Sequence, residues 1–347
     1  MVLSVQYMRA IAALLVVLHH SLEKGVQYNM ISQNWFDTGG ELGVNLFFII
    51  SGYIMCHATY NKQIHFKKFL KARFIRILPL YWILTTVVLV IFFISPELIN
   101  SSGGTTSIFD SYLLIPSGNK YLVQNGWTLS YEFYFYFIFA LGLSAMGYMK
   151  YFIPMIVITL LILIGMFIQF NAPILKFLTH QTLLEFLLGI LSFIAFQKYS
   201  INKITSVLLV ISAAILVYWS AQGEINIYVF KYVLPLFFFI GMRGLESSFV
   251  SLQKSMPSKL LEGLGNSSYS LYLIHPFALV VVSKVLYLVG ALLPSSLFLL
   301  LLMVASLIAG HLCYLVLEQN LTQFFKSLRI KNNKFNLDSI KIEKSHT

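Results

Sequence analysis

Arg9 and His20 stand in one apolar run near the N-terminus, and their types and spacing suggest chemistry at two depths of a membrane. Eleven positions on an α-helix turn the chain by about 1100° and advance it by roughly 16 Å, so the two groups share a face. Charged and titratable groups inside a membrane helix are costly and by default suggest function. An interfacial anchor for Arg9 and a satisfied polar group for His20 are the structural alternatives. His19 is rotated by about 100° from the shared face and is a further candidate.

Two arginines just before the third apolar segment have the spacing of a phosphate site. Arg73 and Arg76 are i, i+3 neighbours on one helical face. Guanidinium groups are planar and bind phosphate through paired hydrogen bonds, so this pair could form a cytoplasmic anion site together with Arg9. The alternative is a positively charged anchor at the membrane surface, which is the interpretation we adopt for the lysines around the pair.

Glu132 lies inside an aromatic segment, where a carboxylate needs a partner. The order of the apolar segments places it in the outer third of the membrane, near the depth of His20. We expect Glu132 to orient the His20 imidazole and to stabilise its protonated form. A structural hydrogen bond between helices is the alternative.

Other polar residues in apolar segments have less specific signals. The pair Ser51-Gly52 permits close helix approach and predicts packing. His275 precedes Pro276, which frees a backbone carbonyl, so this histidine either lines a cavity or bridges helices. Three charged residues fall in membrane segments toward the outer side, where they could border an acceptor cleft: Glu185, Lys231 and Lys284.

The elements that must position these residues are membrane helices. The chain of 347 residues is 58% hydrophobic and 11% charged, with mean hydropathy +0.79, whereas soluble domains carry about 25% charged residues. This composition predicts an all-α polytopic membrane protein. The formal net charge of +11 fits the positive-inside rule, so nucleic acid is not expected as a partner. The two cysteines do not imply a disulfide framework.

Ten apolar segments are long enough to be membrane helices. They cover 5–21, 43–58, 77–95, 127–147, 151–170, 180–197, 204–221, 226–241, 265–288 and 295–317. The first is interpreted as a retained helix because no small-residue cleavage site follows it. The sequence therefore predicts a transmembrane domain over 1–317 and a basic cytoplasmic tail over 318–347.

The basic residues set the orientation of the helices. With the N-terminus in the cytoplasm, ten helices place 19 of the 24 Lys and Arg residues inside and 3 in the outer loops. This bias predicts that both termini are cytoplasmic. Arg9 then lies near the inner surface and His20 near the outer one.

Five motifs, taken together and in order, resemble those of the acyltransferase-3 family of integral membrane O-acyltransferases. The resemblance runs from Tyr7 to about Glu318, and Asn45 and Thr128 depart from it, standing where the family commonly has Asp and Ser. The matching residues are Arg9 and His20; Gly43, Phe47, Phe48, Ser51 and Gly52; Arg73, Arg76 and Pro79; Trp127, Leu129 and Glu132; and Gly265, Ser268, Tyr269, Tyr272, Leu273, His275 and Pro276.

The resemblance implies transfer of an acyl group, commonly acetyl, from cytoplasmic acyl-CoA to a carbohydrate hydroxyl at the outer face of a bacterial cytoplasmic (inner) membrane. We expect His20 and Glu132 to be catalytic and Arg9, Arg73 and Arg76 to hold the CoA phosphates. The further site candidates are His19, Ser51, Trp127, Tyr269 and His275. Acetyl-CoA, the carbohydrate acceptor and the lipid bilayer are the expected partners, and no metal is expected.

Two other functions fit the same buried charges. A transporter or translocase of a lipid-linked sugar would use them to gate a path. An acyl-group exporter would deliver the acyl group to a separate transferase. The sequence leaves open the acceptor, the acyl chain, the oligomeric state, whether His19 or His20 acts, and whether an acyl-histidine forms.

Overall fold

Helices make up the regular structure of the computed structural model, which describes residues 2–33, 39–96, 104–289 and 293–327. Within these ranges the one β-type pairing is an isolated bridge between Thr106 and Lys120. The helices are α1 (Leu3–Gln27), α2 (Gly39–Thr59), α3 (Phe66–Ile94), α5 (Ile108–Leu113), α6 (Gly126–Gly142), α7 (Met149–Phe167), α8 (Pro173–Leu178), α9 (Leu183–Lys198), α10 (Lys203–Ala221), η1 (Val229–Val233), α11 (Leu234–Gly244), α12 (Glu246–Leu252), α13 (Met256–Val289), α14 (Ser295–Cys313) and η2 (Tyr314–Glu318). The predicted all-α membrane fold is confirmed.

Each of the ten predicted segments falls on a helix. Among the described residues, eight helices are long and apolar enough to cross a membrane, or nine if α11 with its π-helical start and α12, bent by 56°, form one span. The remaining segment corresponds to α6, whose 17 residues are at the lower limit for a span. It ends at Gly142, earlier than the predicted 147.

The last helix continues beyond the predicted membrane segment. One helical stretch of 33 residues runs from Ser295 to Ser327 and contains the π-helical turn η2. Residues 318–327 of the predicted tail therefore belong to this helix, because no proline or glycine interrupts them. Residues 328–347 of that tail lie outside the described residues.

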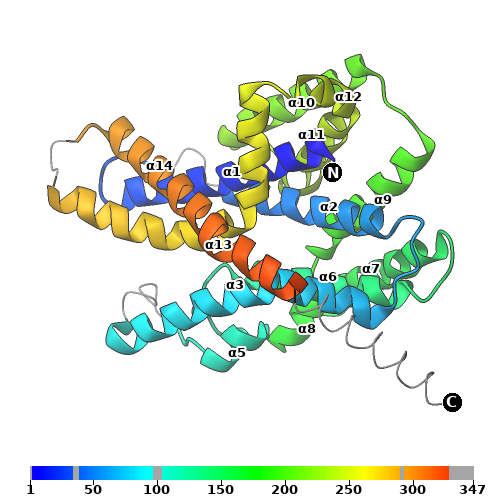
Figure 1. Cartoon of the computed structure of the whole chain (residues 1–347), viewed down its shortest axis with the longest axis horizontal. Coiled ribbons are helices and arrows are strands. Elements are labelled where there is room, and N and C mark those ends of the chain that lie inside the picture. The colour runs from blue at the N-terminus through cyan, green and yellow to red at the C-terminus, as the bar shows by residue number, and fades with distance from the viewer. Residues whose placement is uncertain (1, 34–38, 97–103, 290–292, 328–347) are drawn as a thin grey trace, which may run out of the picture.

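The helix α1 packs against α2, α13 and α14, and α2 also packs against α9 (Figure 1). Small residues allow these close approaches. A Cβ atom on Gly52 would overlap the carbonyl oxygen of Phe186 in α9, which confirms the packing role predicted for the Ser51-Gly52 pair. A Cβ on Gly265 of α13 would overlap the carbonyl oxygen of Gln6 in α1. Figure 1 shows α10–α12 on one side of α2 and α3, α6 and α7 on the other.

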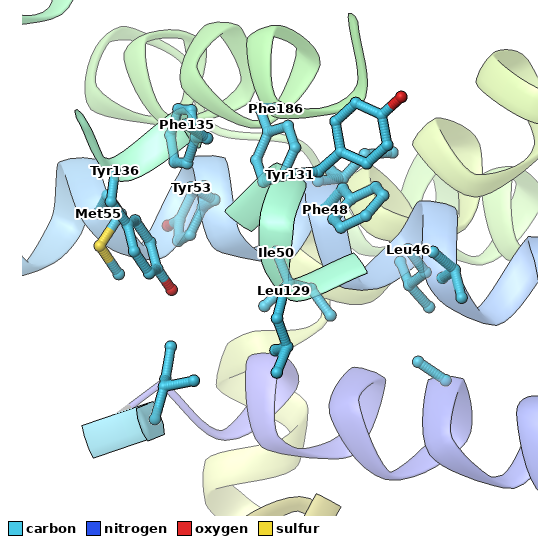
Figure 2. Packing of buried hydrophobic residues seen from close by; sticks show 14 of the residues in the cluster. Leu46, Phe48, Ile50, Tyr53, Met55, Leu129, Tyr131, Phe135, Tyr136 and Phe186 are labelled. Carbon is cyan, nitrogen blue, oxygen red and sulfur yellow. The ribbon is translucent and has the colours of Figure 1, made fainter. Parts of the chain in front are cut away.

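An aromatic core joins α2, α6 and α9. The ring of Phe186 lies between Phe48 and Phe135, with centroid distances of 4.6 and 4.4 Å. Figure 2 shows these rings, with Tyr53 and Tyr136 nearby. Aromatic pairs at such distances add to the stability that burial provides. This core fixes α6 against α2 and so places Glu132 relative to Ser51.

The start of α1 is held by a carboxylate from another helix. Glu246 at the beginning of α12 accepts hydrogen bonds from the backbone N–H of Leu3 (2.9 Å) and Ser4 (2.8 Å). Its Oε2 also lies 4.0 Å from Nη1 of Arg243. A carboxylate satisfies the free N–H groups and complements the positive end of the helix dipole. The contact fixes the N-terminal end of α1, and with it the position of Arg9.

Pro276 produces the freed carbonyl that the sequence predicts. A proline inside a helix removes the hydrogen bond to the carbonyl four residues earlier, which here belongs to Tyr272. The side chain of Asn125, directly before α6, donates from Nδ2 to this oxygen at 2.7 Å. The Tyr272 hydroxyl is also 2.9 Å from Oγ1 of Thr128. The proline therefore creates the contact that joins α13 to the start of α6.

Candidate functional site

A cavity of about 760 Å³ lies among α1, α2, α3, α6, α13 and the end of the last helix. Arg9, Arg73 and Arg76 all line it, although they come from two helices far apart in the sequence. The structure therefore brings together the three arginines predicted to bind phosphate. Lys326 and two carboxylates, Glu132 and Glu318, complete its charged lining, which leaves a positive excess.

Three residues that line this cavity carry buried polar atoms without a hydrogen-bond partner among the residues described. Gln6 Oε1, Arg73 Nε and Ser268 Oγ are buried and have no hydrogen-bond partner within the described part of the chain. The Arg73 guanidinium carbon lies 5.7 Å from the centre of the Phe69 ring, which holds its planar group in place. Buried polar groups are normally hydrogen-bonded. These residues therefore have unused hydrogen-bonding capacity beside the cavity.

Glu132 is bound within the cavity wall. Its Oε1 accepts a hydrogen bond from Ser51 Oγ at 3.1 Å and another from the Tyr136 hydroxyl. The predicted contact with His20 is wrong, because His20 Nδ1 pairs with Glu23 Oε2 at 2.5 Å. Glu23 is one turn further along the same helix, so it reaches the imidazole without crossing the bundle. Ser51 is thus a hydroxyl partner of Glu132 as well as a packing residue.

A cluster of three histidines lies at the other end of α1. The imidazole of His20 stacks on that of His275, with centroids 5.3 Å apart and planes at 25°. His19 contacts the His20 ring at 4.8 Å between centroids, and its Nε2 lies 3.4 Å from Glu23 Oε1. His275 is fully buried, with Nδ1 3.1 Å from the Leu271 carbonyl oxygen and Nε2 without a partner among the described residues.

The histidine cluster has the donor atoms of a metal site, although no metal is expected from the sequence. One ligand atom each from His19, His20 and Glu23 lie within 4.8 Å of one another. Imidazole and carboxylate donors suit a divalent transition metal. The same contacts also serve a metal-free role. A carboxylate only accepts hydrogen bonds, so His20 donates from Nδ1 in this pairing, and in the neutral imidazole Nε2 then keeps its lone pair.

Tyr272 connects the cavity with the histidine cluster. Its side chain lines the cavity, and its ring centroid lies 6.0 Å from that of His275. Arg9 is at the cavity end of α1 and His20 is in the cluster, 11 residues further along. The cavity therefore extends to within one aromatic ring of the histidine pair.

Of the further site candidates, Tyr269 lies in the cavity wall and Trp127 does not. Tyr269 lines the cavity and donates from its hydroxyl to the Ile77 carbonyl oxygen at 2.7 Å, which joins α13 to α3. Trp127 is 44% exposed, packs edge-on against Tyr131, and is not part of the cavity wall. Trp127 is in the first turn of α6, which begins at Gly126, and its indole lies on the surface of that helix.

A second cluster of polar side chains lies on α2, η1 and α9. Lys231 Nζ pairs with Glu41 Oε1 at 2.7 Å, and the carbonyl of Lys231 accepts from Asn45 Nδ2 at 3.3 Å. Glu185 is 2% exposed, and its Oε2 has no partner among the described residues. Asn45 therefore supports the π-helical turn η1, a role that an aspartate could not fill as a donor.

Sequence reasoning missed Glu23, Tyr136 and Glu318. Glu23 and Tyr136 have a detectable signal, because they stand three and four residues from His20 and Glu132 on the same helix faces. Glu318, which accepts from Ser270 Oγ, lies in a stretch that composition assigns to the start of the tail. Its place beside Arg9 and Arg76 in the lining of the cavity depends on tertiary packing alone.

Comparison with known proteins supplies a family. A family model described as an acyltransferase domain matches residues 2–315. The exopolysaccharide production protein ExoZ of Rhizobium meliloti (strain 1021) is 27% identical over 302 residues, covering 84% of this chain and 93% of that protein. The peptidoglycan O-acetyltransferase OatA of Listeria monocytogenes is 28% identical over 158 residues, covering 39% of this chain and 23% of that protein. No solved structure matches.

Proposed function

The chain belongs to the acyltransferase-3 family of membrane O-acyltransferases, and we propose that it moves an acyl group, most simply acetyl, from cytoplasmic acyl-CoA to a hydroxyl of a cell-surface or lipid-linked carbohydrate. The observation that carries this proposal is the cavity in which Arg9, Arg73 and Arg76 meet. The names of the two relatives, one in exopolysaccharide production and one a peptidoglycan O-acetyltransferase, support a polysaccharide acceptor.

The donor end of the site suits CoA phosphates. Guanidinium groups bind phosphate through two parallel hydrogen bonds, and three of them around one cavity favour a ligand with several negative charges. The unpaired Gln6 Oε1 and Ser268 Oγ offer polar contacts for the amides of the pantetheine arm. In the predicted orientation, this end of the cavity faces the cytoplasm, where acyl-CoA is available.

The acceptor end is assigned to His20. The pantetheine arm carries the thioester past Tyr272, over the roughly 16 Å that separate Arg9 from His20 along α1. His20 Nε2 accepts the proton of the acceptor hydroxyl as its oxygen attacks the thioester carbon. The C–S bond breaks, and the departing thiolate takes the proton from His20. In an alternative route, His20 carries the acyl group before the acceptor receives it.

Glu23 and Glu132 have separate roles in this scheme. Glu23 accepts from His20 Nδ1, orients the imidazole and compensates its positive charge during transfer. Glu132 stays in the donor cavity, where it holds the Ser51 and Tyr136 hydroxyls near the arginines. We place the enzyme in the bacterial cytoplasmic membrane with both termini inside, as the charge bias predicts.

The test uses the full-length protein in sealed vesicles with labelled acetyl-CoA on the cytoplasmic side. Acetyl groups should appear on an added polysaccharide on the opposite side, and only when CoA thioester is supplied. Release of free acetate without need for an acceptor would indicate an acyl exporter. Movement of a lipid-linked sugar without CoA dependence would indicate a translocase, and either result overturns the proposal.

A further inference from the structure

A second cavity, of about 520 Å³, adjoins the donor cavity at the junction of α2 and α3. The two cavities share Ala72 and Arg73 in their walls. Besides Arg73, the second cavity is lined by Lys62 and Lys68, and its wall includes no aspartate or glutamate. It is therefore a basic cavity that borders the donor cavity at Arg73, the residue already assigned to phosphate.

Helix ends add to this positive character. The helix α3 begins at Phe66 without a side-chain cap, and its first turn holds no acidic residue. Lys67 and Lys68 are in that turn, where the positive end of the helix dipole normally favours acidic residues. The opposing carbonyl end of α2 is partly neutralised, because Lys150 Nζ donates to the Thr59 oxygen at 2.7 Å. An anion would compensate the excess charge.

Arg73 is arranged to act in both compartments. Its guanidinium packs on Phe69, which lines the second cavity, while Arg76 one turn later lines the first. Lys68 precedes Arg73 by five residues, a separation of about 7.5 Å along the helix. In CoA, the diphosphate and the 3′-phosphate are on opposite sides of one ribose. The spacing of the basic groups along α3 suits both phosphates of a single molecule.

We propose that the second cavity is the subsite for the 3′-phosphate of the CoA donor, with Lys62 and Lys68 as its ligands and Arg73 between it and the diphosphate. The inference rests on the proposed function, because it assumes an acyl-CoA donor. It assigns to Lys68 a role beyond membrane anchoring. Lys67 and Lys71 are exposed on the same stretch of α3 and line neither cavity, so they are matched controls.

The experiment compares acetyl-CoA with acetyl-dephospho-CoA as donors for the purified full-length enzyme in detergent. Loss of a charged hydrogen-bonding partner should raise KM about tenfold or more for the dephospho donor with wild-type protein. In the variant K62Q/K68Q, KM for acetyl-CoA should rise to a similar value, and the difference between the two donors should disappear. The control K67Q/K71Q should keep the wild-type preference.

The outcomes separate this inference from the proposed function. If neither donor supports transfer by wild-type protein, the acyl-CoA assignment itself is wrong. If both donors have the same KM with wild-type protein, the proposed function stands and the subsite is overturned. If K62Q/K68Q matters only in nanodiscs containing phosphatidylglycerol, with no difference between donors, the lysines bind a lipid phosphate, which also overturns the subsite. Thermal unfolding of each variant establishes that it is folded.

Discussion

The His20 ring stacks on the His275 ring at 5.3 Å, which joins the first membrane helix to the long helix α13 at the far end from Arg9. His275 is fully buried and fixed by its contact with the Leu271 carbonyl, whereas the side chain of His20 is 36% exposed. A buried ring thus supports a partly accessible one. This geometry suits a base that must stay in place and still meet a substrate.

Replacing His20 with alanine should lower kcat by about 10²- to 10⁴-fold, because general base catalysis is lost. Glu23→Gln should lower kcat to a smaller extent with KM for acetyl-CoA unchanged, since the carboxylate acts through His20 and is distant from the donor cavity. Steady-state transfer of labelled acetyl measures both effects. The control is His180→Ala. The His180 side chain hydrogen-bonds to Thr182, two residues further along the chain. Full activity of His20→Ala would remove His20 from the mechanism.

Two variants of His275 should separate ring packing from chemistry. His275→Ala leaves a space in a closed interface and should destabilise the protein by about 2–5 kcal/mol, with a loss of activity. His275→Phe keeps the ring under His20 and should retain most of the kcat. Thermal unfolding and kcat are measured together. A stable but inactive His275→Phe protein would show that a nitrogen of His275 takes part in transfer.

The membrane fold could be predicted from sequence because composition and apolar length decide it. The Arg9–His20 spacing and the Arg73–Arg76 pair also needed only helix geometry, which is local. We expected Arg9, Arg73 and Arg76 to form one anion site because the predicted topology puts all three on the cytoplasmic side, and the structure brings them to one cavity.

The pairing of side chains across helices could not be predicted in the same way. To sequence reasoning, both Glu23 and Glu132 are available to His20, but the structure places Glu132 in the donor cavity with Arg9, and this position depends on rotation of α6 about its axis. The aromatic stack of Phe48, Phe186 and Phe135 sets this rotation, and no single segment encodes it. With this packing, Glu132 accepts a hydrogen bond from Ser51, and His20 pairs with Glu23 on its own helix.

Asp110 should make the segment before α6 sensitive to acid. Hydrogen bonds from Ser117 and Asn119 hold the pKa of this carboxyl below its usual value. A lowered pKa in the folded state contributes stability above the unfolded value, and this contribution is lost as pH falls through the folded value. As pH is lowered, the Tm of the wild-type protein should therefore fall by more than the Tm of Asp110→Asn. Parallel pH profiles for the two proteins would contradict the assignment.

A Glu132 variant can distinguish the role predicted from the sequence, in which Glu132 orients His20, from the position in the donor cavity that the structure shows. Its carboxylate accepts from both Ser51 and Tyr136 in the donor cavity. Both hydrogen bonds go to one oxygen, Oε1, so the amide oxygen of Glu132→Gln can still accept them, but it carries no charge and the bonds lose their charge assistance. We expect KM for acetyl-CoA to rise by about three- to tenfold, with a smaller change in kcat, since two hydrogen bonds in the donor cavity are weakened and neither is removed. Ser51→Ala should change KM in the same direction. If Glu132→Gln instead lowered kcat as strongly as His20→Ala and left KM unchanged, Glu132 would act on the reacting groups, and the donor cavity would have to extend to them.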